Sequence, residues 1–199
     1  MASAVIHLCV ANEYLKKTNK KSLELLIGSI APDIAKYIGV HKMETHFQEK
    51  NDDIPNLKLF LNKYSNYLND DFVLGYYIHL YTDYLWFKFF LPRYVEASLK
   101  NKLQEEELTN YLYANYSNLN IKLIEDYNLS LDVFYNEIPK INNIIEEIPM
   151  DKLNIVVDEM GRIIKDSKKG QTYMFGIKEV EFFIDLAKEA IYNEVKSWL

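Results

Sequence analysis

The stretch that decides the fold reads Phe72-Val-Leu-Gly-Tyr-Tyr-Ile-His79-Leu-Tyr-Thr-Asp83-Tyr-Leu-Trp-Phe-Lys-Phe-Phe-Leu-Pro92. Its apolar residues cover nearly every face of a helix for about five turns, which is typical of a helix buried at the centre of a protein. The stretch is also about long enough to span a bilayer. However, it contains His79, Asp83 and Lys88, and ionisable side chains near a bilayer centre cost several kcal/mol. We therefore expect the central helix of a soluble protein without a transmembrane segment.

The chain on either side of this central helix also predicts helices. Apolar residues recur at helical spacing over residues 4–17, 22–27, 57–68, 72–100, 105–127, 130–145, 149–165 and 177–199. Ser130 is the expected N-cap of the helix over 130–145, and residues 39–53 are expected to be irregular, with short elements at most. The sequence contains no repeat, no low-complexity tract and no linker rich in Pro, Gly or Ser. It therefore predicts one all-α domain over residues 1–199, a compact multi-helix bundle of about seven helices.

The composition agrees with this fold class and excludes several functions. Of 199 residues, 49% are apolar and 26% charged, and only 6 are glycine and 5 proline, too few for the many turns of a β-sandwich or barrel. The net charge of -6 offers no broad positive surface for nucleic acid. Cys9 is the only cysteine, which excludes an internal disulfide. Because the N-terminal sequence lacks the positive segment of a secretory signal, we expect a cytoplasmic location.

All four histidines, His7, His41, His46 and His79, lie in the first 83 residues. His79 and Asp83 are four residues apart, so they project from the same face of a helix and can bind one divalent ion together. Their neighbours are almost all apolar, and a bound Zn²⁺ would compensate the cost of burying a carboxylate there. The alternative is a hydrogen bond between the two side chains that satisfies both of them in the core.

Three further residues extend this pattern, although each has an ordinary explanation when taken singly. His7 interrupts the apolar face of the helix over 4–17, where a hydrogen-bonded core histidine is usual. Asp33 ends the run Gly28-Ser-Ile-Ala-Pro-Asp33, where a helix N-cap is usual, and His46 would ordinarily be a solvated loop residue. With His79 and Asp83 they make three imidazoles and two carboxylates. This is the ligand chemistry of zinc sites that leave one position open for water.

In these residues the chain resembles the zinc-dependent phospholipase C family, whose superfamily also contains the P1-type nucleases. The resemblance covers about the first 90 residues and follows the family's order and similar separations. It rests on His7, Gly28-Ser-Ile-Ala-Pro-Asp33, Thr45-His46-Phe47 and Gly75-Tyr-Tyr-Ile-His79-Leu-Tyr-Thr-Asp83. It implies a compact all-α bundle around a cluster of up to three zinc ions.

The resemblance also implies roles for individual residues. Asp33, His46, His79 and Asp83 would form the best-preserved metal position, and Asp83 would bridge towards a second ion held partly by His7. Asp33 would also be the general base, or the carboxylate that orients the attacking water. Family members with a full cluster carry two further histidines and a glutamate after the His-x-x-x-Asp helix, and secreted members add a processed N-terminal tryptophan. Because this chain has no histidine after His79, one zinc ion or two are expected.

The expected function is that of a zinc-dependent, phospholipase C-like hydrolase acting on a phosphate ester, either a phosphodiester or a phospholipid-like substrate. The metal would lower the pKa of bound water from near 16 towards about 7, and Asp33 would take up the proton. His41, Arg93, Lys36 and Lys42 are candidates for holding the phosphate, and nothing in the sequence selects among them. The alternative is a non-catalytic helical protein that kept part of the family's zinc cluster for stability.

Other enzyme classes lack their required residues. An HD-type phosphohydrolase needs an adjacent His-Asp pair, and a di-iron bundle needs Glu-x-x-His on two helices; neither pattern occurs in the sequence. Cys9 lies in an apolar stretch with no obvious cation to lower the pKa of its thiol, which argues against a cysteine nucleophile. The chain also lacks a strongly basic amphipathic helix for a membrane surface.

Overall fold

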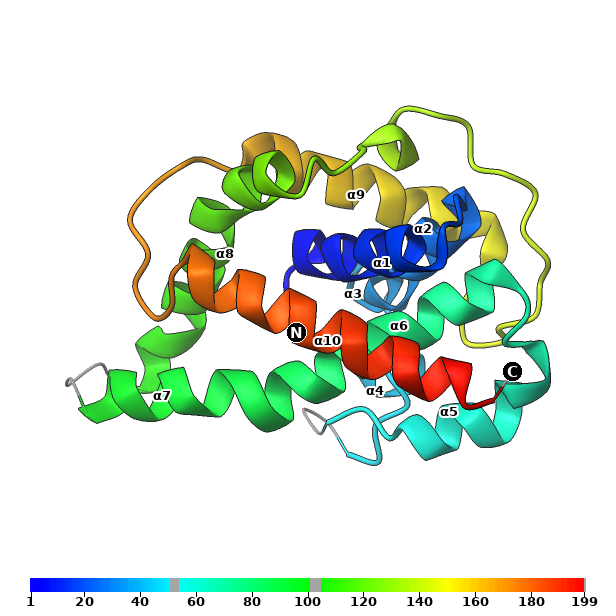
Figure 1. The fold of residues 1–199 in the computed structure, drawn as a ribbon, viewed down its shortest axis with the longest axis horizontal. Coiled ribbons are helices and arrows are strands. Elements are labelled where there is room, and N and C mark those ends of the chain that lie inside the picture. The colour runs from blue at the N-terminus through cyan, green and yellow to red at the C-terminus, as the bar shows by residue number, and fades with distance from the viewer. Residues whose placement is uncertain (51–53, 101–104, 199) are drawn as a thin grey trace.

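The computed structural model of the chain describes residues 1–50, 54–100 and 105–198, and all regular secondary structure in these ranges is helical (Figure 1). The α-helices are α1 (Ala4–Thr18), α2 (Leu23–Gly28), α3 (Ala35–Ile38), α4 (Lys42–Thr45), α5 (Leu57–Tyr64), α6 (Asp71–Leu85), α7 (Leu91–Lys100), α8 (Glu105–Asp126), α9 (Leu153–Asp166) and α10 (Ile177–Lys196). Short 3₁₀ turns lie at Ala31–Ile34, Ser65–Tyr67, Asp132–Phe134 and Met150–Lys152. A π-helical turn, Trp86–Phe90, joins α6 to α7. The all-α prediction is confirmed, with seven helices of at least six residues in the described ranges when α6 and α7 count as one.

Helix α1 lies in the middle of the bundle and contacts α2, α6, α8 and α10 (Figure 1). Ser3 caps its N-terminus, because the Oγ atom accepts a hydrogen bond from the Ile6 amide at 3.2 Å. Asn19 ends the helix in the left-handed conformation, at φ 53°. Every residue from 4 to 11 is buried, which is far broader than the single apolar stripe of a surface helix. His7 is therefore enclosed by the bundle on all sides.

Helix α6 is the second central element, as the sequence predicted. Asp70 caps it, since its Oδ1 atom accepts hydrogen bonds from the amides of Phe72 at 3.0 Å and Val73 at 3.2 Å. All residues from 72 to 80 are buried. The following π turn, Trp86–Phe90, ends two residues before Pro92, which has no amide hydrogen for the preceding turn of an α-helix. The wider turn lets the helix continue into α7 past this residue.

Two glycines allow α2 and α6 to approach each other at backbone distance. A Cβ atom added at Gly28 would overlap the carbonyl oxygen of Phe72, and one added at Gly75 would overlap the carbonyl oxygen of Leu25. Any other residue at either position would push the two helices apart, since both obstacles are backbone atoms. This close contact fixes the position of Ser29, which follows α2, relative to His79 on α6.

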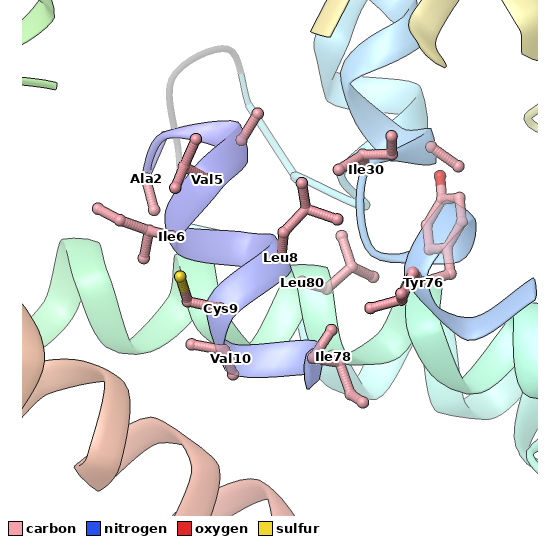
Figure 2. Packing of buried hydrophobic residues seen from close by; sticks show 14 of the residues in the cluster. Ala2, Val5, Ile6, Leu8, Cys9, Val10, Ile30, Tyr76, Ile78 and Leu80 are labelled. Carbon is pink, nitrogen blue, oxygen red and sulfur yellow. The ribbon is translucent and has the colours of Figure 1, made fainter. Parts of the chain in front are cut away.

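Apolar side chains from α1, α6 and the turn after α2 pack together beside this contact. Figure 2 shows them: Ala2, Val5, Ile6, Leu8, Cys9 and Val10 from the N-terminal segment, with Ile30, Tyr76, Ile78 and Leu80. All ten are at most 4 % exposed. Burying an Ile or Leu side chain stabilises the folded state by about 1.5–3 kcal/mol. This stabilisation offsets the unfavourable burial of the polar groups next to the cluster.

Helix α10 covers one side of α1 and behaves as its sequence pattern predicted. Its buried residues are Val180, Phe183, Ile184, Ala187, Ile191 and Val195, the face expected from their spacing. The predicted end of this helix, Leu199, lies outside the described residues. None of the helices in the described ranges combines the length and the apolar character that crossing a bilayer requires.

The predicted helix over 130–145 is wrong. The structure has only the 3₁₀ turn Asp132–Phe134 there, followed by irregular chain up to Pro149. Pro139 lies in the middle of this segment, and proline both lacks an amide donor and disfavours the helical conformation of the residue before it. Ile145 and Ile148 are nevertheless buried. The apolar residues that suggested a helix here instead attach an irregular segment of the chain to the core.

The other boundaries agree within a few residues. The segment predicted as irregular, 39–53, contains only the single-turn helix α4, and its residues 51–53 lie outside the described part of the chain. The helix predicted from Pro149 or Asp151 starts as a 3₁₀ turn and continues as α9. Asp33 lies in the 3₁₀ turn Ala31–Ile34, which leads into α3, so it sits at a helix start as the preceding proline suggested.

Candidate metal centre

The structure brings together all five residues that the sequence proposed as metal ligands. His7 comes from α1, Asp33 from the 3₁₀ turn after α2, His46 from the residue after α4, and His79 and Asp83 from adjacent turns of α6. Asp33 is 5 % exposed and the other four are fully buried. We call this group the His–Asp cluster.

The rings of His46 and His79 meet at the centre of the cluster through their Nε2 edges, with their planes 74° apart. The Nε2 atoms of His46 and His79 are 3.2 Å apart. The carboxylate oxygens lie next to them: Asp33 Oδ1 is 3.7 Å from His46 Nε2, and Asp83 Oδ2 is 3.8 Å from the Nε2 atoms of both His46 and His79. Four side chains thus direct one ligand atom each towards a common region.

Asp83 connects this region to His7. Its other oxygen, Oδ1, is 3.4 Å from His7 Nε2 and accepts a hydrogen bond from the Ala2 amide nitrogen at 2.8 Å. The ring of His7 stacks on that of His79, with centroids 3.8 Å apart and planes 10° from parallel. Asp83 therefore faces three imidazoles, two through one oxygen and one through the other.

Hydrogen bonds on the far side of each ring fix which nitrogen faces the cluster. His79 Nδ1 is 2.8 Å from the Ser29 carbonyl oxygen, which can only accept, so the proton sits on Nδ1. His46 Nδ1 is 3.0 Å from Thr45 Oγ1, and the same hydroxyl oxygen is 3.3 Å from the Lys42 carbonyl oxygen. When Thr45 donates to that carbonyl, His46 donates from Nδ1 and both Nε2 atoms carry lone pairs. In this tautomer the two lone pairs repel each other at 3.2 Å unless a cation lies between them.

The chain around His46 is held in place by α6. The Tyr76 hydroxyl donates a hydrogen bond to the Thr45 carbonyl oxygen. The next residue, Phe47, has φ 52°, a conformation that is uncommon for a residue other than glycine. Its ring packs edge-on against Phe60, with centroids 5.2 Å apart. The packing of aromatic side chains thus keeps the segment after α4 turned so that His46 points inwards.

Several polar atoms of the cluster form no hydrogen bond with the described residues. They are His7 Nδ1, His7 Nε2, Asp33 Oδ1 and Asp83 Oδ2. A buried polar atom without a partner costs about 1–3 kcal/mol, and a charged one costs more. Folding alone therefore leaves this cluster unsatisfied, and a bound cation is the group that would satisfy carboxylate and imidazole lone pairs together.

The pKa values favour the ligand forms of these side chains. Burial lowers the pKa of His46 to about 3 and that of His79 well below its usual value, so both rings are neutral at neutral pH. Burial by itself would raise the pKa of Asp83, but the neighbouring His7 and His79 hold it well below its usual value. Burial raises the pKa of Asp33, and the Asp83 charge adds to that rise while His7 opposes it. Neutral imidazoles beside an ionised carboxylate are the state that binds metal.

The donor set and the distances fit a transition-metal ion. Two groups of three side chains have one ligand atom each within 4.8 Å of one another, His7–His79–Asp83 and Asp33–His46–His79. Zinc bonds of about 2.0–2.2 Å in a tetrahedron place neighbouring ligand atoms roughly 3.3–3.5 Å apart, close to the separations of 3.2–3.8 Å found here. His79 belongs to both groups and has only Nε2 free, so its ring can bind one ion at a time.

Two of the four residues proposed for phosphate binding, His41 and Arg93, lie away from the His–Asp cluster. His41 is exposed at the residue before α4, and Arg93 lines a groove between α7 and α10 together with Phe182. Neither forms a hydrogen bond or ion pair with the His–Asp cluster in the described part of the chain. The sequence reasoning missed Ser29 and Thr45, which orient the rings of His79 and His46. Thr45 could have been suspected as a neighbour of His46, whereas a backbone carbonyl such as that of Ser29 leaves no signal in the sequence.

Comparison with known proteins gives no match: no family model, no curated protein and no solved structure is significantly similar to this chain.

Proposed function

We propose that the His–Asp cluster binds zinc, as one ion or two, and that the chain is a metal-dependent hydrolase of phosphate esters. The observation that supports this most is the pair of Nε2 atoms from His46 and His79, 3.2 Å apart and buried between two carboxylates. Zinc bound at such a site polarises a phosphoryl oxygen and makes water nucleophilic at neutral pH. The resemblance of residues 7–83 to the zinc-dependent phospholipase C family supports the same class of reaction.

Asp33 has the position that a general base needs. It is the one residue of the His–Asp cluster among the described residues that line a cavity of about 270 Å³, so water reaches the cluster beside its carboxylate. Burial raises the pKa of this carboxyl group, which makes it a stronger proton acceptor than an exposed aspartate. We propose that Asp33 orients the attacking water and accepts its proton.

A structural metal site is the second candidate, and one observation favours it. Four side chains, Asp33, His46, His79 and Asp83, each already direct one atom to the same region. Four protein ligands are typical of structural zinc sites, whereas catalytic sites keep one position open. In this alternative the ion would stabilise the bundle, and Asp33 would be a ligand only.

Metal analysis of the purified protein tests the site that both candidates share. We expect about one zinc ion per chain in the wild type and none in His79→Ala. The matched control is His41→Ala, which should keep its zinc because His41 is exposed and outside the cluster. Equal zinc in wild type and His79→Ala, or none in either after dialysis against zinc, contradicts the assignment.

Hydrolysis assays separate the two candidates. The zinc-loaded protein is assayed with chromogenic phosphodiesters and phosphomonoesters, and we expect turnover that a chelator abolishes. Asp33→Asn should lower the rate by about 10²-fold or more, and its zinc content, measured in the same samples, distinguishes loss of the base from loss of the metal. If the zinc-containing wild type hydrolyses neither ester at any pH, the hydrolase proposal is wrong and the structural metal site is the remaining candidate.

A further inference from the structure

The cavity beside Asp33 is formed by four parts of the chain that lie far apart in the sequence. Ala2 and Ser3 contribute from the start of α1, Asp33 and Lys36 from the segment after α2, and Asn120 from α8, with α9 closing the remaining side. Its volume of about 270 Å³ is slightly below the range of drug-sized ligand pockets, about 300–1,000 Å³. The cavity therefore holds a small molecule whose one end can reach Asp33.

Lys36 carries the one cationic side chain among the described residues that line this cavity, and it is an exposed residue. It lies one helical turn after Asp33, so both side chains project from the same side of this segment. Its Nζ atom is 4.8 Å from the centroid of the Tyr37 ring. Burial by itself lowers the pKa of Lys36, but Tyr37, Asp33 and Tyr113 raise it overall, so the side chain stays charged at neutral pH.

The start of α1 adds a second feature that favours an anion. Ala2, Ser3 and Ala4 line the cavity, so the N-terminal end of a fifteen-residue helix faces it. The first amides of a helix have no partner within the helix, and the helix dipole is positive at this end. Anions bind readily where such an end meets a cationic side chain.

Hydrogen bonds within the chain hold the polar side chains of the opposite wall. Ser3 Oγ donates to Asn120 Oδ1 at 3.2 Å, and Asn120 Nδ2 donates to Ser167 Oγ at 2.9 Å. Ser167 Oγ in turn donates to the Ile163 carbonyl oxygen at 2.9 Å. Asp166 also lines the cavity and is exposed, as Lys36 is, so water screens both charges. Most of the remaining lining is apolar and comes from side chains such as Tyr116 and Met160.

We propose, on the basis of the function proposed above, that this cavity binds the substrate and that Lys36 is its phosphate-binding residue. The Lys36 Nζ atom and the N-terminal end of α1 hold non-reacting phosphoryl oxygens, which brings the phosphorus beside Asp33. The substrate class that fits is a small phosphate ester with a short alcohol. The volume of the cavity favours such an ester over a nucleotide or a two-chain phospholipid.

Calorimetric titration of the zinc-loaded protein with inorganic phosphate tests the role of Lys36. We expect Lys36→Met to weaken phosphate binding at least about tenfold, the effect of losing one charge-assisted hydrogen bond, and Lys36→Arg to restore most of it. Lys42→Met is the matched control, because Lys42 is a nearby lysine whose Nζ lies 5.6 Å from the Phe87 ring and which does not line the cavity. Unchanged affinity in Lys36→Met, or an equal loss in Lys42→Met, overturns the proposal.

Two further measurements separate this proposal from the proposed function and test the size of the substrate. If the wild type hydrolyses chromogenic esters and Lys36→Met has the same KM, the phosphate site is wrong and the hydrolase stands. If the wild type shows no turnover but loses phosphate affinity in Lys36→Met, the site stands and the hydrolase is wrong. Glycerol 3-phosphate should bind more tightly than adenosine 5′-monophosphate, and the reverse order would overturn the size argument.

Discussion

Asn115 on α8 and His79 on α6 are both fully buried polar side chains, yet their surroundings differ. Asn115 Nδ2 donates to the Phe175 carbonyl oxygen at 2.8 Å, and its Oδ1 atom accepts from the amides of Tyr173 and Met174 at 2.6 and 3.1 Å. We call this set of bonds the Asn115 clip, because it fastens the segment before α10 to α8. His79 has one such bond, to Ser29, and its Nε2 atom faces the Nε2 atom of His46 at 3.2 Å.

This difference distinguishes two uses of buried polarity. In the Asn115 clip every polar atom finds a partner within the chain, so the clip is part of folding and needs nothing further. In the His–Asp cluster the chain brings lone pairs together and provides too few donors for them. Burial of the surrounding apolar side chains offsets the cost of these unpaired polar atoms. A bound cation would supply the missing partner.

Removing the metal should be the largest perturbation. Under the proposed function, a free zinc concentration a thousandfold above Kd stabilises the folded state by about 4 kcal/mol. Chelation should therefore lower the Tm of the wild type by about 8–16 °C, as measured by circular dichroism. His79→Ala should show no chelator effect, whereas Asn115→Ala should show the same drop as the wild type. A chelator effect of equal size in His79→Ala would contradict the difference between the two clusters.

The contact between α2 and α6 should matter nearly as much. Gly75→Ala places a Cβ atom against the Leu25 carbonyl oxygen, so the helices must separate, at a cost of about 3 kcal/mol. Because this contact sets Ser29 against His79, zinc content should fall as well. In Gly161→Ala the new Cβ meets only the Phe134 ring, at 3.4 Å, and both stability and zinc content should stay near those of the wild type. Urea unfolding with metal analysis measures the two variants side by side.

Breaking the Asn115 clip should have an intermediate effect that is independent of metal. Asn115→Ala leaves two amides and one carbonyl oxygen without their partner, and we expect a loss of about 2 kcal/mol in the free energy of unfolding from urea titration. Asn110 lies on an exposed position of the same helix, so Asn110→Ala should change stability by less than about 0.5 kcal/mol. Zinc content should be unchanged in both variants, and a loss of zinc in Asn115→Ala would show that the two clusters are coupled.

The pH dependence of the metal-free protein should be the smallest of the four effects. Burial lowers the pKa of His46 to about 3 and that of His79 well below its usual value. Below about pH 6.5 the unfolded chain therefore takes up protons that the folded chain does not, and stability falls as the pH falls. Between pH 7 and 6 we expect a loss on the order of 1 kcal/mol in urea titrations. His41→Gln should keep this slope, since His41 is exposed, and His46→Gln should reduce it; an unchanged slope in His46→Gln would contradict the burial argument.

The site could be predicted from the sequence to different extents in its different parts. His79 and Asp83 are four residues apart on a helix whose neighbours are apolar, and this local pattern already places them together. His7, Asp33 and His46 carry no such local signal, and the resemblance to a known family was needed to connect them. Phosphate-binding residues were not selected by the sequence, because Lys36, His41 and Arg93 are equally plausible until the cavity shows which of them lies beside Asp33.

The helical class, the buried face of α10 and the central position of α6 follow from side-chain periodicity, which is a local property of the chain. The same periodicity gave a wrong prediction for residues 130–145, where isoleucines at helical spacing anchor an extended segment that Pro139 keeps out of a helix. The packed fold was needed to show that Gly28 and Gly75 bring two backbones into contact, that Ser29 and Thr45 contact the imidazoles, and that a cavity lies beside Asp33. These features depend on atoms far apart in the chain, and their distances are fixed only when the whole core packs.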